Sequence, residues 1–137
     1  MHKEYKFPFE RYEIWSLSIN FSINMYRLTT NFPNEEKYGM ICQIRRASNS
    51  VGANIAEGVS RFSEKEKARF IEISFGSLME VAHFLFLAKE LGFIDEENFN
   101  NIKPEIFKLS NKINLFHKLL KGQNQIDSKS RNKQISK

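Results

Sequence analysis

The sequence contains few of the residues that interrupt helices or cross-link a chain. Its 137 residues include three prolines and six glycines, which leaves room for long helices. The single cysteine, Cys42, has no second cysteine to pair with, so no internal disulfide is expected. No window of about 18 residues is apolar and free of charge, and the first residues lack the apolar segment of a secretion signal. We therefore expect a cytoplasmic protein without a membrane-spanning helix.

Motifs that carry catalysis or bind cofactors are also scarce. The glycines are scattered rather than gathered in a phosphate-binding loop, and Cys42 has no histidine near it in the sequence to activate a nucleophile. The Glu-x-x-His spacing of di-iron bundles occurs once, at Glu80 and His83, whereas such a site needs the motif on a second helix too. We expect no enzyme, cofactor, metal or small-molecule substrate, and metal analysis of the purified protein tests the metalloenzyme alternative.

Apolar residues, in contrast, are plentiful. Hydrophobic residues make up 41% of the chain and thirteen residues are Phe, enough for the core of one domain. The formal net charge is +5, but residues 122–137 hold four basic residues and one acidic residue, so the rest of the chain is close to neutral. We predict an N-terminal arm over 1–8, a folded region over 9–121 and a disordered basic tail over 122–137.

Most of the region 9–121 shows apolar residues at alternating spacings of three and four, the pattern of amphipathic helices. The three stripes are Ile41, Ile44, Ser48, Val51, Ile55 and Val59; Phe70, Ile73, Ser77, Val81, Phe84 and Ala88; and Phe99, Ile102, Ile106, Leu109, Ile113, Phe116 and Leu120. Short turn signals separate the segments: Pro33 with Asn34 as a helix cap, then 58–63 with Ser63 as a cap, then 92–95 with Asp95 as a cap. Because short connections join antiparallel neighbours, the sequence predicts an all-α, up-and-down antiparallel four-helix bundle.

The first segment carries two conflicting patterns. From Leu17 to Met25 apolar and polar residues alternate at every step, which is typical of a half-buried strand. A helix there would instead carry two neighbouring apolar stripes, one of them containing Trp15, Ile19 and Ile23. We favour the helix, because a single strand in this chain would have no other strand to pair with.

The stretch QIRRASNSVGANIAEGVSR, residues 43–61, resembles the four-helix bundle proteins encoded in bacterial 23S rRNA intervening sequences. Shorter matching pieces lie at 26–33, 36–39, 74–80 and 88–92. The resemblance covers about residues 9–121 and implies a four-helix bundle that assembles into a homo-oligomer, as a ring of five copies. A further similarity, to the accessory proteins of diversity-generating retroelements, implies nucleic acid and a reverse transcriptase as partners. Gly52 departs from the pattern of the family, which has a larger residue or proline there.

A row of polar residues runs beside the apolar stripe of the second helix. With one residue of the third helix it forms a predicted interhelical polar seam: Gln43, Arg46, Ser50, Asn54, Glu57 and Glu80. We favour a structural role, in which hydrogen bonds and ion pairs fix the register of the two helices. A ligand or nucleic-acid surface is the alternative. Gly58 and Gly76 lower helix propensity, and we expect close backbone approach at both.

Two further sets of residues are candidates for interaction surfaces. Phe84–Ala88 is apolar through more than one helical turn, so part of it faces outward and predicts self-association. The candidate oligomer-interface residues are Trp15, Ile19, Phe84, Phe86 and Leu87. The candidate RNA or DNA contacts are Arg45, Arg61, Lys65, Lys67, Arg69, Lys129, Arg131 and Lys133. We thus expect a homo-oligomeric binding or scaffold protein, with a nucleic-acid-binding accessory factor as the alternative.

Overall fold

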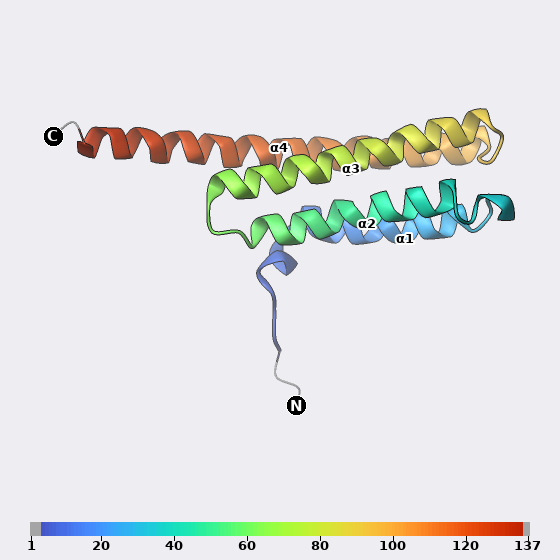
Figure 1. Ribbon diagram of the computed structural model, residues 1–137, viewed down its shortest axis with the longest axis horizontal. Coiled ribbons are helices and arrows are strands. Elements are labelled where there is room, and N and C mark those ends of the chain that lie inside the picture. The colour runs from blue at the N-terminus through green and yellow to red at the C-terminus, as the bar shows by residue number, and fades with distance from the viewer. Residues whose placement is uncertain (1–3, 136–137) are drawn as a thin grey trace.

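Four long helices form the molecule, and each runs antiparallel to the next along the chain (Figure 1). The computed structural model describes residues 4–135, with side chains for 4–123 and 129–131. The helices are α1 (Glu13–Thr29), α2 (Met40–Val59), α3 (Glu64–Glu90) and α4 (Glu96–Ile135). Two short 3-10 turns, η1 (Pro8–Arg11) and η2 (Asn34–Glu36), precede α1 and α2. The predicted all-α four-helix bundle is confirmed, and residues 4–135 contain no strand.

The core is built from the apolar stripe of each helix. The largest fully buried side chains include Phe21, Met25, Ile44, Leu78 and Ile113. The stripes predicted for α2 and α4 face this core, whereas the stripe predicted for α3 does so only in part: Phe70, Val81 and Ala88 are buried, but Ile73, Ser77 and Phe84 are not. The buried residues of its long central part are Ile71, Ser74, Leu78, Val81, Leu85 and Ala88. Apolar residues occur nearly all round α3, so spacing alone does not select the stripe that faces inward.

The helix ends follow the capping chemistry of the sequence in three of four places. The Ser63 Oγ accepts from the Glu66 amide at 3.1 Å, and Asp95 Oδ1 accepts from the Asn98 amide at 2.7 Å. Gly92 adopts φ +79° after α3, a left-handed conformation that favours glycine. Asn34 does not cap α2, because that helix begins later, at Met40.

The segment that alternates like a strand is entirely helical, within α1. Its polar residues do not form one solvent-facing side, because several of them bond to neighbouring helices. The Ser22 hydroxyl donates to the Ser48 carbonyl at 3.0 Å, and Asn24 donates to Glu105 at 2.9 Å. Ser18 is fully buried and donates to the carbonyl of Trp15 at 2.6 Å. Satisfied polar groups inside the bundle therefore account for the alternation.

Both ends of the chain extend past the bundle (Figure 1). Residues 4–7 are non-helical and exposed, while 1–3 lie outside the described residues. At the other end, the sequence predicts a disordered tail over 122–137, whereas α4 continues as helix to Ile135. A helix already nucleated by packed residues extends without the cost of a new first turn, and this stretch contains no proline.

Each helix packs beside its neighbours in sequence, and α4 closes the bundle against α1. Across the described residues no Cα atom of α1 lies within 8 Å of one of α3, so these two helices lie diagonally in the bundle. By length and composition alone α3 is apolar enough to cross a membrane. One third of its most apolar 18-residue stretch is buried in the bundle, where α3 packs against α2 and α4.

Candidate functional site

The polar seam between α2 and α3 has two separate parts. In the first, the Arg46 guanidinium lies 2.9 Å from Glu80 Oε1 on α3 and donates to Gln43 Oε1 at 2.9 Å. Both members of the ion pair are more than a third exposed, so the pair contributes only about 0.2–1 kcal/mol. This part links the two helices at the surface without a large stabilising effect.

The second part lies deeper and is made of neutral groups. Ser77 Oγ donates to Ser50 Oγ across the two helices at 2.9 Å. The Asn54 amide donates to the Ser50 carbonyl and hydroxyl, at 2.8 and 2.9 Å, and so stays on its own helix. The sequence analysis missed the most buried link, in which Ser74 Oγ donates to the Val51 carbonyl at 2.7 Å. The available signal was Ser74, a serine at a position where the helical spacing calls for an apolar residue.

Other charged residues near the predicted seam find partners elsewhere. Glu57 pairs with Arg61, 3.8 Å away on the same helix. Glu72 lies 2.8 Å from His117 Nε2, which belongs to α4 rather than α2. Glu72 and Glu80, which lie on one polar row of α3, therefore contact different neighbouring helices.

Half of the eight basic residues predicted to contact nucleic acid contact the protein itself. Arg45 donates to Thr29 Oγ1 at 2.9 Å and stacks over the Tyr26 ring, 4.7 Å from its centroid. Arg61 and Arg69 both lie over the Phe70 ring, at 4.4 and 4.9 Å from its centroid. These guanidinium groups serve the packing of helix ends.

The remaining candidates from that set are lysines and the end of α4. Lys67 pairs with Glu64 at 3.2 Å, whereas Lys65 is exposed. Lys129 and Arg131 are exposed on the part of α4 that extends beyond the bundle, and the side chain of Lys133 lies outside the described residues. A depression between α3 and α4 brings acidic and basic groups together: Glu64, Lys65, Glu66, Arg69, Glu72 and Lys121. Its balanced charge gives no net attraction for a phosphate chain.

Outward apolar residues occur on the two diagonal helices. On α1, Ile19, Ile23 and Tyr26 are each about 42% exposed. Their spacing of four and three puts them on one outward side. Of the predicted interface residues, Trp15 is half-buried against Phe9, with ring centroids 4.8 Å apart.

The outward side of α3 is apolar as well. Leu87, Ile73 and Phe86 are 40–47% exposed, and Phe84 is half-buried beside His83. Phe86 leans toward α4, where its ring centroid lies 4.9 Å from that of Phe99. Of the predicted interface residues, Trp15 and Ile19 therefore belong to α1, Phe84 and Leu87 to the outward side of α3, and Phe86 to the side of α3 that meets α4.

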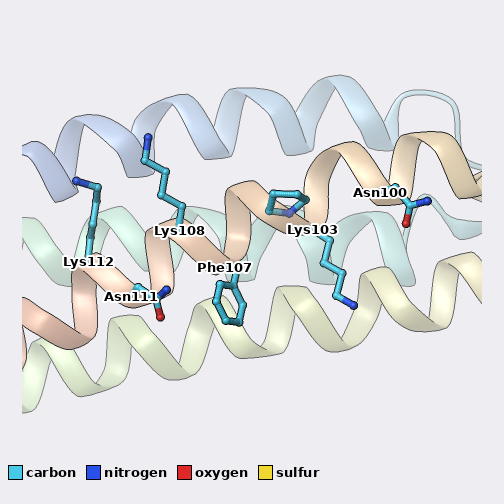
Figure 2. A pocket seen from close by; sticks show the side chains of 7 residues that line it. Asn100, Lys103, Phe107, Lys108, Asn111 and Lys112 are labelled. Atoms are coloured by element: carbon cyan, nitrogen blue, oxygen red, sulfur yellow. The ribbon is translucent and has the colours of Figure 1, made fainter.

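The sequence analysis missed a basic surface along α4. A shallow depression of about 640 Å³ lies on its outward side, lined by Asn100, Lys103, Pro104, Phe107, Lys108, Asn111 and Lys112 (Figure 2). Lys108 and Lys112 extend toward α1, while Lys103 and Phe107 extend toward α3 (Figure 2). Residues 98–123 contain five lysines and one glutamate, and this local excess was the available signal.

Groups able to hold a metal are absent from the described part of the chain, where no three His, Cys, Asp or Glu side chains come together. Cys42 is exposed and carries a free thiol. Glu80 contacts Arg46, and His83 contacts the Phe84 ring, so the single Glu-x-x-His pair takes part in packing and ion pairing.

These features define a helical-bundle protein with outward-facing apolar and basic surfaces. Residues 10–115 match the family of 23S rRNA-intervening sequence proteins, and the chain belongs to that family. It is also similar to a crystal structure, at 1.70 Å resolution, of a protein of unknown function from the S23 ribosomal protein family of Bacteroides thetaiotaomicron. That similarity has a TM-score of 0.69 at 21% identity, over 77% of this chain and 98% of the other. Among curated proteins none matches this chain.

Proposed function

We propose that the protein is a non-enzymatic, cytoplasmic scaffold that acts as a homo-oligomer. The observation that carries this proposal is the pair of outward apolar surfaces on α1 and α3. The α1 surface consists of Ile19, Ile23 and Tyr26, and the α3 surface of Ile73, Phe84 and Leu87. Large apolar side chains gathered on a surface mark a site of association.

The placement of the two surfaces favours a ring. Because α1 and α3 lie diagonally, their outward sides point away from each other. Contact between the α1 surface of one copy and the α3 surface of the next is heterologous, since it joins two different surfaces. Such contacts close into a ring when a whole number of the rotations that relate one copy to the next makes a full turn. The resemblance to the family implies five copies.

Light scattering coupled to size-exclusion chromatography tests the assembly. Five copies of the 16.1 kDa chain give a mass of about 80 kDa. Leu87→Glu places a charge in the α3 surface and is expected to reduce the mass to that of a smaller species. Asn101→Glu, an exposed change on α4, adds the same charge outside both surfaces and serves as the matched control. A 16 kDa species for the unaltered chain at micromolar concentration contradicts the proposal.

The second candidate is a nucleic-acid-binding accessory factor, for a structured RNA or a reverse transcriptase. The predicted contacts Arg45, Arg61 and Arg69 do not favour it. Arg45 is engaged with Tyr26 and Thr29, and Arg61 and Arg69 are engaged with Phe70. The basic surface of α4 does favour binding to nucleic acid, and it lies on neither of the two apolar surfaces.

A further inference from the structure

We propose that the outward face of α4 binds single-stranded nucleic acid. This α4 face consists of Asn100, Lys103, Pro104, Phe107, Lys108, Asn111, Leu115 and Lys118. The inference goes beyond the scaffold role and does not depend on assembly, because the α4 face is separate from the outward surfaces of α1 and α3.

The charge of the α4 face is positive and largely without acidic neighbours. Glu105 is the sole acidic residue among positions 98–123, and it is half-buried, where it accepts from Asn24 on α1. Glu13 of α1 neutralises Lys112, at 2.6 Å between Nζ and Oε1. Lys103, Lys108 and Lys118 remain exposed, spread over about 22 Å of helix. Ammonium groups spread over this length match a short run of phosphates rather than one anion.

An exposed aromatic ring in the middle of these lysines indicates single-stranded nucleic acid. Phe107 is 66% exposed, although it lies in the centre of a packed helix. It also lines a second, apolar depression of about 160 Å³ between α3 and α4, with Met79, Phe86 and Ile102. A base freed from a duplex can stack on such a ring, whereas paired bases cannot reach it.

Hydrogen-bonding groups flank the ring. The amides of Asn100 and Asn111 carry both donors and acceptors, and both side chains are exposed (Figure 2). Pro104 has no N–H, so the Asn100 carbonyl loses its usual helical donor and remains an acceptor on the same face. Lys103 is held in place over the rings of Phe86 and Phe99, at 5.4 and 6.0 Å from their centroids. The face thus combines phosphate, base-stacking and base-edge contacts.

Fluorescence anisotropy with a labelled 20-nucleotide oligo(U) tests the proposal on the full chain at several salt concentrations. Lys108→Glu with Lys118→Glu is expected to weaken binding at least ten-fold at low salt and to reduce the salt slope by about 1.5. Phe107→Ala is expected to weaken binding about five-fold or more with an unchanged salt slope, because it removes stacking but no charge. Lys37→Glu, an exposed change in the α1–α2 connection and outside the α4 face, is the control and leaves binding unchanged.

Four results would overturn the proposal. The first is no binding of oligo(U) by the unaltered chain at low salt, and the second is equal competition by a perfect duplex or by polyglutamate. The third is loss of binding with Lys129→Glu and Arg131→Glu but not with Lys108→Glu and Lys118→Glu. The fourth is a Phe107→Ala chain whose only change is a lower oligomeric mass. The last of these assigns Phe107 to contact between copies. Circular dichroism of each variant shows whether the fold is kept.

Discussion

Gly52, Gly58 and Gly76 lie inside helices but differ in how closely a neighbouring helix approaches them. A Cβ built on Gly52 of α2 would lie 2.6 Å from Ser18 Oγ on α1, so the two helices approach closely there. A Cβ on Gly58 would lie 2.8 Å from the Phe70 Cβ, which is the close approach expected from the sequence. Gly76 of α3 differs, since a Cβ there has no neighbour within 4 Å. The expectation of close approach at Gly76 is wrong.

The pair Gly52 and Gly76 therefore makes a prediction about stability. Gly52→Ala is expected to destabilise the protein by about 1–3 kcal/mol, because overpacking against Ser18 outweighs the gain in helix propensity. Gly76→Ala is expected to stabilise it by about 0.5–1 kcal/mol. Guanidinium unfolding measures both, in the Leu87→Glu background so that assembly does not contribute. Adding Ser18→Ala should recover part of the loss at Gly52, and equal stabilisation by both alanines would contradict the close approach.

At the scale of helices, the contact between α1 and α4 depends on pH. The hydrogen bond and charge of Lys112 hold the pKa of Glu13 below its usual 4.5, with a smaller contribution from Lys108. A carboxyl with a lowered pKa stabilises the fold above its unfolded value, and this contribution is lost as the pH falls through the folded value. The Glu13–Lys112 pair therefore stabilises the bundle at neutral pH, and this contribution is lost in acid as the Glu13 carboxylate is protonated.

Thermal unfolding between pH 2.5 and 7 checks this. At pH 7 the unaltered chain is expected to have a higher midpoint than the Glu13→Gln chain, by a small amount because Glu13 is exposed, and the two midpoints should match at pH 2.5. In a Lys112→Gln background the difference at pH 7 should largely vanish, as a double-mutant cycle requires. A difference that persists unchanged in that background would assign the effect to another partner of Glu13.

Sequence patterns predict which segments of this chain are helical better than they predict which helices pack against one another. The stripes of α2 and α4 are predictable because polar residues occupy their other sides. On α3, Phe84–Ala88 is apolar all round, so the buried side depends on packing that spacing does not encode. Arg46 and Glu80 lie together on facing rows, yet Glu72 of the same row contacts His117. A pattern shows which residues share a face, but not which helix covers it.

At the scale of the whole molecule, the four helices expose different chemistry to solvent. The diagonal helices α1 and α3 each present an apolar outward side, and the outward side of α4 presents lysines around Phe107. A scaffold that binds its own copies through two opposite sides keeps a third side open for another partner. Assembly through α1 and α3 would therefore repeat the α4 face once per copy, and repeated faces bind a long strand more tightly than one face does.

If the α1 surface of one copy binds the α3 surface of the next, two variants that are each blocked at a different surface should still bind each other. A symmetric dimer would not behave in this way. Ile19→Glu with Ile23→Glu blocks the α1 surface, and Leu87→Glu blocks the α3 surface. If contact is heterologous, each variant alone lacks one half of the interface and stays monomeric. An equimolar mixture still contains one intact pair, the α3 surface of the first variant against the α1 surface of the second, so it should form a heterodimer of about 32 kDa from two 16.1 kDa chains. Light scattering of each variant and of the mixture measures this, with Asn101→Glu expected to keep the full assembly. Dimers formed by either variant alone would show instead that each surface pairs with its own kind, and the ring would be excluded.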